Sequence, residues 1–385
     1  MPVRTLAVFA ALLSALATAV PPEARAQAAN RARAAANRLD LHPALQVALK
    51  TQPGAPPAYD ATSAYVPLQG ARLVAVDLET GRIRWSTEVE VAQAPAVTSG
   101  VLIVATADAL IGLDTAQGTE RWRIAIPHPL SAPPLGDTGW VLASLESGEL
   151  LALRATDGHV LWRQTLPAPA SARPVAAAHG VYVPLADGQV VALALDTGVV
   201  RWTRRLGGAP ADLLVLDDRL FLGADDRHFY CLNTSNGKIR WSHRIGARPA
   251  GAPVVDTARV YYVALDNILH AFDRGGGSRK WHRPLPIRPS GGPLMVDDLV
   301  LVPAVAAELH AYDGAIGEPA GHVGIDADVA SAPQLVPDPD PLFPRIALVT
   351  REGIVTVFVR RIEPAPTPLP HPLGTRVDLS QVDAP

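Results

Sequence analysis

A glycine that precedes a tryptophan by four residues recurs at regular intervals along this chain. The complete copies are Gly81/Trp85, Gly118/Trp122, Gly158/Trp162, Gly198/Trp202, Gly237/Trp241 and Gly277/Trp281, and a seventh copy, Gly317/Gly321, lacks the indole. Prolines mark a second position in the same frame, about ten residues after the tryptophan position: Pro57, Pro95, Pro133, Pro174, Pro210, Pro253, Pro293 and Pro333. Successive prolines are 36 to 43 residues apart, a period that is typical of propeller blades or solenoid repeats. The chain therefore contains eight repeat units.

Each unit has the pattern of short β-strands joined by turns. In one unit, two apolar runs of five residues, 101–105 and 109–113, are separated by the polar residues Thr106 and Asp108, and a turn-rich segment, 114–118, follows. Apolar runs of this length, rich in β-branched residues and bounded by Gly, Asp and Thr, indicate strands and not helices.

The two ends of the chain are complementary. Residues 45–50 have the pattern of the last strand of a unit, with Val47 in the tryptophan position. Residues 331–359 supply the first three strands of a unit, and the prolines that follow from Pro364 onward prevent a fourth. We therefore predict an all-β fold, an eight-bladed β-propeller of four-stranded antiparallel blades, closed by an N-terminal strand that joins the C-terminal blade. A closed ring leaves no open sheet edge.

The chain divides into four parts. Residues 1–26 read as a secretory signal peptide, with Arg4, an apolar run over 6–20 and the sequence Ala24-Arg25-Ala26 before Gln27. The other parts are a tether over 27–43, the propeller over 44–361 and a Pro-rich disordered tail over 362–385. We expect cleavage between Ala26 and Gln27 and a soluble, exported protein, in the periplasm or an equivalent space. An uncleaved membrane anchor is the alternative, although a mainly apolar run of fifteen residues is short for a membrane span.

Composition excludes several functions. A formal net charge of −3 provides no basic surface for nucleic acid. The single cysteine, Cys231, excludes an internal disulfide and a cysteine-based zinc site.

Cys231 also falls in a frame position that is small in every unit, so it is expected to be a packing residue in a tightly spaced interface between blades. Each tryptophan is expected to be a structural residue of the repeat that lies flat against the adjacent blade and buries a large apolar area.

The segment Ala75-Val-Asp-Leu-Glu-Thr-Gly-Arg-Ile-Arg-Trp85 resembles the tryptophan-docking motif of the quinoprotein-type, PQQ-like β-propellers, and the resemblance extends over residues 44–361. Within that family, the length and the single exported domain look most like the BamB proteins, which are periplasmic scaffolds of outer-membrane protein assembly. This resemblance implies a non-catalytic scaffold without a cofactor, most simply a monomer, that binds a protein partner in the cell envelope. The chain departs from BamB in lacking a lipid-bearing cysteine and in its proline-rich tail.

The alternative is a small quinoprotein dehydrogenase that uses PQQ and Ca²⁺. Enzymes of that kind are usually longer and carry vicinal cysteines, which one cysteine cannot provide, and no single loop here gathers the carboxylate and amide groups of a calcium site. A sensor or carbohydrate-binding propeller is a third possibility, but no aromatic cluster lies outside the repeat frame. No residue is predicted to be catalytic, to bind a cofactor or to ligate a metal.

The histidines of the later units are the first candidate site. His270 and His310 occupy the same frame position, which holds Val74 or Ile111 in earlier units. A metal site would need these side chains to converge, whereas residues of adjacent blades at this depth lie away from the central axis, so packing between blades is the favoured interpretation.

The second candidate is the face that carries the turns between second and third strands and the loops between blades. Its charged residues are Asp108, Glu146, Arg173, Asp187, Asp226, Arg248, Asp266 and Arg288. Turns favour aspartate for conformational reasons alone. The functional interpretation is a mixed-charge surface on which complementary charges orient a protein partner.

Overall fold

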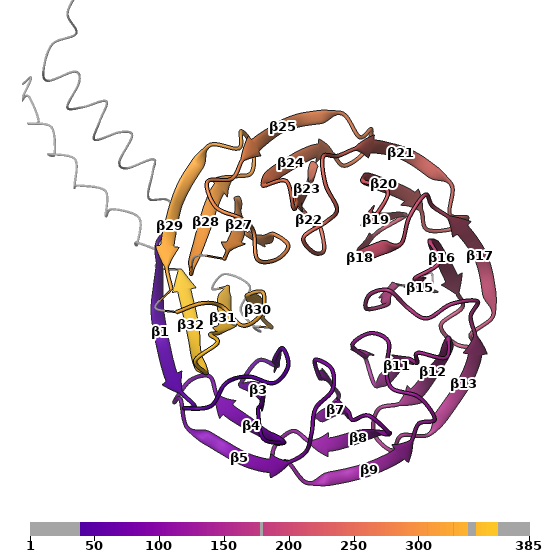
Figure 1. Cartoon of the computed structure of the whole chain (residues 1–385), viewed down its shortest axis with the longest axis vertical. Helices are drawn as coiled ribbons and strands as arrows, with labels where there is room; N and C mark the ends of the chain where they lie inside the picture. Colours follow the sequence, from indigo (N-terminus) through magenta and orange to yellow (C-terminus); the bar gives the residue numbers. More distant parts are fainter. Residues whose placement is uncertain (1–38, 178–179, 306, 326, 338–343, 361–385) are drawn as a thin grey trace, which may run out of the picture.

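The computed structural model describes residues 39–177, 180–305, 307–325, 327–337 and 344–360. Eight four-stranded antiparallel sheets are arranged as a ring around a central opening (Figure 1). The predicted eight-bladed propeller is confirmed. The predicted signal peptide, its cleavage position and the Pro-rich tail lie outside the described residues, as does most of the predicted tether.

In blades 1 to 7 the strands run from the centre of the ring to its periphery in chain order. Blades 1 and 2 contain β2 (Ala58–Tyr59), β3 (Ser63–Leu68), β4 (Arg72–Asp77) and β5 (Ile83–Glu88), then β6 (Ala96–Thr98), β7 (Val101–Ala105), β8 (Ala109–Asp114) and β9 (Glu120–Ala125). Blades 3 and 4 contain β10 (Leu135–Asp137), β11 (Trp140–Ser144), β12 (Glu149–Arg154) and β13 (Val160–Thr165), then β14 (Val175–Ala177), β15 (Gly180–Pro184), β16 (Gln189–Leu193) and β17 (Val200–Arg205).

The second half of the ring continues this pattern. Blades 5 and 6 contain β18 (Pro210–Leu216), β19 (Arg219–Ala224), β20 (His228–Asn233) and β21 (Ile239–Arg244), then β22 (Val254–Val255), β23 (Arg259–Ala264), β24 (Ile268–Asp273) and β25 (Arg279–Pro284). Blades 7 and 8 contain β26 (Leu294–Val296), β27 (Leu299–Ala304), β28 (Glu308–Asp313) and β29 (Pro319–Gly324), then β30 (Gln334–Val336), β31 (Arg345–Val349), β32 (Ile354–Arg360) and, from the other end of the chain, β1 (Leu41–Ala48).

Strand β1 closes the ring as the outermost strand of blade 8. It pairs antiparallel with β32, with Val47 opposite Val355, and Figure 1 shows the first and last coloured segments side by side. The predicted start of the propeller at residue 44 is wrong by a few residues, because β1 begins at Leu41 and Leu39 is already buried. Both leucines pack in the interface between blades 7 and 8, so the apolar core extends into the predicted tether.

The core of the protein consists of clusters between adjacent blades. One such cluster joins Tyr65 and Trp85 of blade 1 to Leu102 and Ile111 of blade 2, and equivalent clusters occupy the other interfaces around the ring. Because both faces of every sheet are covered by neighbouring blades, the second and third strands are buried along almost their whole length. This burial of apolar surface is the main stabilising contribution to the ring.

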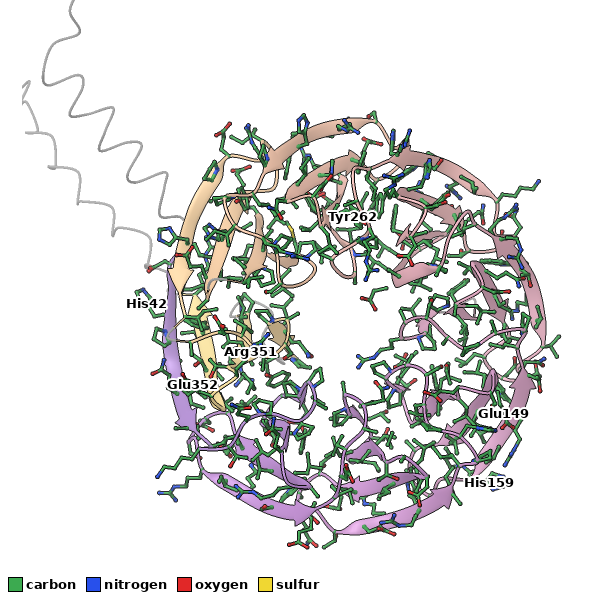
Figure 2. The ribbon with its side chains drawn as sticks, in the orientation of Figure 1. His42, Glu149, His159, Tyr262, Arg351 and Glu352 are labelled. Carbon is green, nitrogen blue, oxygen red and sulfur yellow. The ribbon has the colours of Figure 1, made fainter. Side chains whose placement is uncertain are left out.

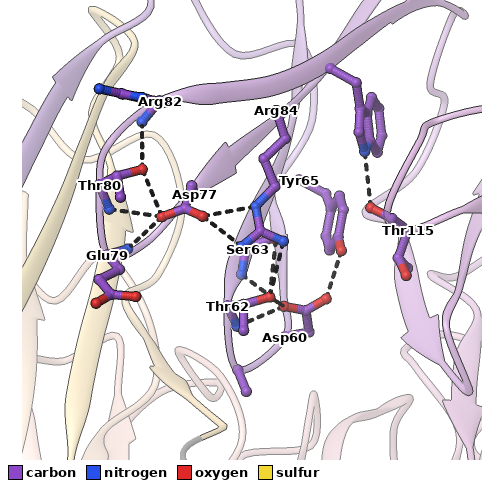
Figure 3. Close-up of polar contacts among 12 residues, drawn as sticks. Asp60, Thr62, Ser63, Tyr65, Asp77, Glu79, Thr80, Arg82, Arg84 and Thr115 are labelled. Carbon is purple, nitrogen blue, oxygen red and sulfur yellow. Dashed lines mark hydrogen bonds and ion pairs between the residues drawn. The ribbon is translucent and has the colours of Figure 1, made fainter.

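The turn between the third and fourth strands is built by an aspartate and a glycine. The Asp77 carboxylate accepts hydrogen bonds from the backbone N–H groups of Glu79 (3.0 Å) and Thr80 (2.7 Å) (Figure 3). The N–H of Gly81 donates to the Asp77 carbonyl at 2.9 Å. Gly81 has φ of +71°, a left-handed conformation in which glycine has no steric penalty. The glycine of the repeat motif is therefore a requirement of the turn.

The tryptophans connect each of blades 1 to 6 to the following blade. The Nε1–H of Trp85 donates to the carbonyl of Thr115 (2.9 Å), and that of Trp122 donates to the carbonyl of Ala155 (2.8 Å), in each case in the following blade (Figure 3 shows the first). The indole lies so close to the turn glycine of that blade that a Cβ on Gly118 would stand 2.5 Å from the Trp85 ring. Glycine is thus required here both by its backbone conformation and by the indole of the preceding blade.

The tryptophans of blades 3, 4 and 6 make the same contact. The Nε1–H groups of Trp162, Trp202 and Trp281 donate to carbonyls of the next blade, those of Leu195 (2.8 Å), Thr234 (2.8 Å) and Gly314 (3.1 Å) respectively. In blade 5, Trp241 lies against the turn glycine of the next blade, Gly277, but its Nε1 has no hydrogen-bond partner among the described residues.

Burial of the tryptophans differs around the ring. Trp162 is buried like Trp85 and Trp122, whereas Trp202, Trp241 and Trp281 are half-buried. The large buried area expected of every indole is therefore reached in blades 1 to 3 and only in part in blades 4 to 6. The tryptophan is carried by the outermost strand, one edge of which has no neighbouring strand, so the depth of its ring depends on the side chains around it.

The same indoles explain the small residue of the third strand. Gly112 pairs directly with Trp122, and a Cβ on Gly112 would stand 2.2 Å from the ring of Trp122. Cys231 holds this position in blade 5, where it is buried opposite Trp241. The position is small because the indole of the same blade crosses over it, and not because of the spacing between blades that the sequence suggested. Burial raises the pKa of the Cys231 thiol to about 12, as expected for a packing residue.

Candidate functional site

One face of the ring is formed by the loops between blades and the turns between second and third strands. Backbone hydrogen bonds tie each kind of segment to the other: the N–H of Glu146 donates to the Pro129 carbonyl (2.9 Å), that of Leu265 to the Arg248 carbonyl (3.0 Å) and that of Val305 to the Arg288 carbonyl (3.0 Å). We call this surface the loop face. Its segments are held in fixed positions because the blade below each loop supplies the partners for its backbone.

The predicted charged residues of the loop face fall into two groups. Glu146, Arg248 and Arg288 are exposed, and no hydrogen bond or ion pair to another described residue holds their side chains. Asp108 is also exposed, and its carboxylate accepts a hydrogen bond from the Thr106 hydroxyl at 2.9 Å. These side chains project into solvent from a rigid backbone.

Three other predicted carboxylates of this face are half-buried. The Asp226 carboxylate accepts hydrogen bonds from the Tyr230 hydroxyl (2.5 Å) and from the backbone N–H of Gly207 (3.1 Å). Asp187 accepts from the backbone N–H of Gln189 (3.1 Å) and lies 3.3 Å from Arg205. Asp266 is half-buried, and its Oδ1 atom has no hydrogen-bond partner among the described residues. The carboxylates of Asp226 and Asp187 therefore shape turns, the role that aspartate favours in such segments.

Side chains fill the wall of the ring and leave its centre open (Figure 2). A cavity of about 550 Å³ lies in this central channel, at the end that opens toward the loop face, and it is lined mostly by proline, alanine, valine and leucine. Arg173, the remaining predicted residue, projects here beside Asp212, Ser171 and Gln334. Sequence reasoning did not identify Asp212. An adjoining cavity of about 150 Å³ shares Arg173 and Gln334 and is lined by Tyr59.

Arg173 and Asp212 are the ionisable residues that line the larger cavity. Burial within the ring raises the pKa of Asp212 and lowers the pKa of Arg173, and in each case the opposite charge of the other group opposes the shift. Arg173 is nevertheless exposed to the channel, and no hydrogen bond or ion pair to a described residue fixes either side chain. The two groups thus attract each other across the cavity without direct contact.

The candidate histidines lie in separate pairs, one in each of two blades. His270 pairs with His282 across β24 and β25, and His310 pairs with His322 across β28 and β29, so each pair belongs to its own blade. Within the described ranges, no three His, Cys, Asp or Glu side chains lie together in a way that could hold a metal ion. His270 is buried in the interface between blades 5 and 6, where neither ring nitrogen has a described partner, and burial lowers its pKa to about 4.

The lining of the channel also allows a test of the calcium and PQQ alternative. Ca²⁺ takes roughly six to eight oxygen ligands, and a quinone needs a flat aromatic surface. The cavity offers one carboxylate, Asp212, and its neighbour offers one aromatic ring, Tyr59. The described residues that line the channel therefore do not fit that group.

The family model of the outer membrane protein assembly factor BamB matches residues 32–125, 109–217 and 205–332. The chain belongs to the BamB family. The crystal structure of BamB from Moraxella catarrhalis is similar to this chain, with a TM-score of 0.70 and 19% identity over 83% of this chain and 99% of that chain.

The BamB fold is shared more widely. Quinohemoprotein alcohol dehydrogenase from Comamonas testosteroni aligns with a TM-score of 0.67 and 17% identity, over 86% of this chain and 78% of that chain. The computationally designed Ika8 protein aligns with a TM-score of 0.68 and 14% identity, over 81% of this chain and 98% of that chain. No curated protein matches this sequence significantly. At such identities, likeness to these structures shows the BamB-type fold alone. Within the described part of the chain, no helix is long and apolar enough to span a bilayer.

Proposed function

We propose that this protein is a non-catalytic, exported scaffold that presents the loop face of its propeller to a protein partner in the cell envelope, in a BamB-like role in envelope or outer-membrane protein assembly. Export rests on the signal-peptide pattern of residues 1–26. The partner class rests on membership of the BamB family.

The observation that carries the proposal is the rigidity of the loop face. The bonds from Glu146, Leu265 and Val305 to the loops between blades recur at Ala186, Asp225 and Arg351, which bond to Pro169, Ala209 and Asp328. Figure 2 shows Arg351 and Glu352, from the turn between β31 and β32, over blade 8. A surface with fixed loops loses little conformational entropy when a partner binds, which favours affinity.

The charges of the loop face give such a surface specificity. Arg248 and Arg288 follow one another in adjacent loops, while Glu146 and Asp108 lie on the other side of the ring, in blades 3 and 2. Exposed charges of opposite sign on separate sectors orient an approaching protein more than they strengthen its binding.

Cross-linking in cells that produce the full chain tests the proposal. Arg248→Glu with Arg288→Glu should greatly reduce the yield of a specific cross-linked envelope protein, because the partner would meet repulsion where it met attraction. Arg82→Glu is the matched control, since Arg82 is exposed in a turn between third and fourth strands, at the opposite face. Equal yields from both variants would overturn the assignment of this face.

A titration with PQQ and Ca²⁺ separates the scaffold from the dehydrogenase. The scaffold proposal expects no change in the melting temperature or in tryptophan fluorescence. A ligand at about a hundred times its Kd stabilises a protein by roughly 2.7 kcal/mol, so true binding would be evident. A saturable shift would overturn the scaffold proposal.

A further inference from the structure

Because the blades repeat, the residues that line the central channel can be compared position by position among the eight blades. In each blade, one residue of the innermost strand pairs with the third residue of the second strand: Ala58, Ala96, Leu135, Val175, Leu214, Val254, Leu294 and Gln334. The residue two positions earlier, which we call the channel position, is Pro56, Ala94, Pro133, Arg173, Asp212, Ala252, Gly292 and Ala332. Six blades thus have a small or cyclic apolar residue there, and two adjacent blades have opposite charges.

In blade 5, the spacing of the prolines in the sequence does not identify the residue at the channel position. The proline spacing aligns Pro210 with the other inner prolines, but Pro210 pairs with Ala224 and a bulge separates it from Leu213, which pairs with Leu222. Pro210 is therefore the counterpart of Pro249 and Pro289, which pair in the same way with Ala264 and Ala304. Leu213 stands where other blades have proline, and Asp212 stands beside Arg173 in the ring.

The central cavity is built largely from the channel position. Its lining includes this residue from six of the eight blades, Arg173 and Asp212 among them. Arg173 is exposed to the channel and Asp212 is half-buried, and no hydrogen bond or ion pair to a described residue fixes either side chain, so both charged groups are available to a ligand in the cavity. The neighbouring polar groups are already engaged, because Ser171 Oγ–H donates to the Pro210 carbonyl at 2.6 Å and Gln334 Nε2–H donates to the Pro57 carbonyl at 3.3 Å.

We propose that this cavity binds a small zwitterion of the amino-acid or dipeptide class, whose carboxylate lies on Arg173, whose ammonium group lies on Asp212 and whose apolar body lies against Pro56, Ala94 and Pro133. A guanidinium recognises a carboxylate through two parallel hydrogen bonds, and a carboxylate accepts from an ammonium group. A volume of about 550 Å³ is within the range of small-molecule sites. The proposal does not depend on the protein partner of the loop face.

Isothermal titration of the full mature chain with L-alanyl-L-leucine tests the site. Two blocked analogues are compared with it: N-acetyl-L-alanyl-L-leucine lacks the ammonium group, and L-alanyl-L-leucinamide lacks the carboxylate. The titration extends to about 10 mM, well above the Kd of a millimolar ligand. We expect saturable binding of the dipeptide and at least tenfold weaker binding of each analogue. Absence of saturable binding, or equal binding of either analogue, would overturn the proposal.

Two variants assign the binding to its residues. Arg173→Ala and Asp212→Ala should each weaken dipeptide binding at least tenfold, and both should fold because alanine already occupies the channel position of blades 2, 6 and 8. Arg288→Ala on the loop face is the control and should bind like the wild-type chain. If the channel variants melt normally and bind the dipeptide unchanged, the cavity is not its site.

Discussion

The backbone N–H of Leu39 donates a hydrogen bond to the carbonyl of Ala320 at 3.1 Å, which joins the start of the described chain to the outermost strand of blade 7. This contact lies where the repeat is incomplete, because Gly321 replaces the tryptophan opposite Ala311. Leu39 and Leu41 are buried in the interface between blades 7 and 8, in a cluster that contains no indole. The N-terminal segment thus supplies apolar surface at one of the two interfaces whose described clusters contain no tryptophan.

Truncation of Leu39 should therefore weaken the closure of the ring. Leu39→Ala is expected to lower the free energy of unfolding by about 2 kcal/mol, the lower end of the range for buried leucines, since a chain end can adjust its position. Denaturation by urea measures the effect. Leu161→Ala is the control, because Leu161 is 48% exposed and should change stability by less than about 0.5 kcal/mol. Equal losses would show that Leu39 contributes no packing.

The indole N–H of Trp122 should contribute more to the free energy of unfolding than that of Trp241. Trp122 donates to Ala155 from a buried position, whereas Trp241 Nε1 has no hydrogen-bond partner among the described residues. Replacement by phenylalanine keeps most of the apolar area and removes the N–H, so Trp122→Phe should cost about 1 kcal/mol more than Trp241→Phe. Trp122→Ala should cost roughly 3–5 kcal/mol. Urea midpoints of the three variants provide the comparison, and equal midpoints for the two phenylalanine variants would contradict it.

His270 should make the protein less stable at mildly acidic pH. Burial, with smaller contributions from Arg279, His282 and His243, lowers its pKa to about 4 from an ordinary value near 6.5. The unfolded chain therefore binds a proton between these pH values while the folded protein does not, and stability falls as the pH decreases from 6.5 to 4, by at most about 1.4 kcal/mol per pH unit.

The variant His270→Leu tests this dependence. Blade 3 already has a leucine, Leu151, at this frame position, so a leucine should fit in blade 6. The substitution removes two buried ring nitrogens that have no described hydrogen-bond partner, and it should therefore raise the melting temperature. Its melting temperature should also fall less between pH 7 and pH 5 than that of the wild-type chain. His159→Leu, at an exposed position, is the control and should leave the pH profile unchanged. A profile for His270→Leu like that of the wild type would contradict the assignment.

Acid should also loosen the turns that follow the third strands. Hydrogen bonds from the Thr80 backbone and from Arg84 hold the pKa of Asp77 well below its usual range. The stabilisation is thus complete above the ordinary pKa near 4 and is lost as the pH falls further. Asparagine already occupies this position in blade 5, where Asn233 accepts from the backbone N–H of Ser235. Asp77→Asn should therefore keep the turn at a cost of less than about 1 kcal/mol, while Asp77→Ala should cost about 1–2 kcal/mol.

Melting curves from pH 7 to pH 3 distinguish these two effects. The wild-type chain should lose more stability below pH 4 than Asp77→Asn, which has no carboxylate to protonate at that turn. Identical acid profiles would show that the charge of Asp77 does not stabilise the fold.

The sequence predicts which segments form the loop face, but it does not predict which of their charged side chains are exposed. The loop face follows from strand alternation, because turns between second and third strands must emerge on the same side as loops between blades. The sequence could not distinguish Arg248, which is exposed, from Asp226, whose carboxylate is bound by Tyr230 and Gly207. Hydrogen bonds between segments distant along the chain are not encoded in the type or spacing of any single residue.

The repeat itself was determined by the sequence alone. Four-stranded units, their number and the closure of the last blade by the N-terminal strand follow from local signals, since each strand, turn glycine and tryptophan recurs within about forty residues. What only the tertiary structure decided depends on contacts between blades and on small changes of register. Leu39 is buried because it reaches blade 7, and Asp212 lies beside Arg173 because the segment from Pro210 to Leu214 is one residue shorter than the equivalent segments 249–254 and 289–294. A register shift leaves composition and spacing almost unchanged, yet it determines which side chains meet in the channel.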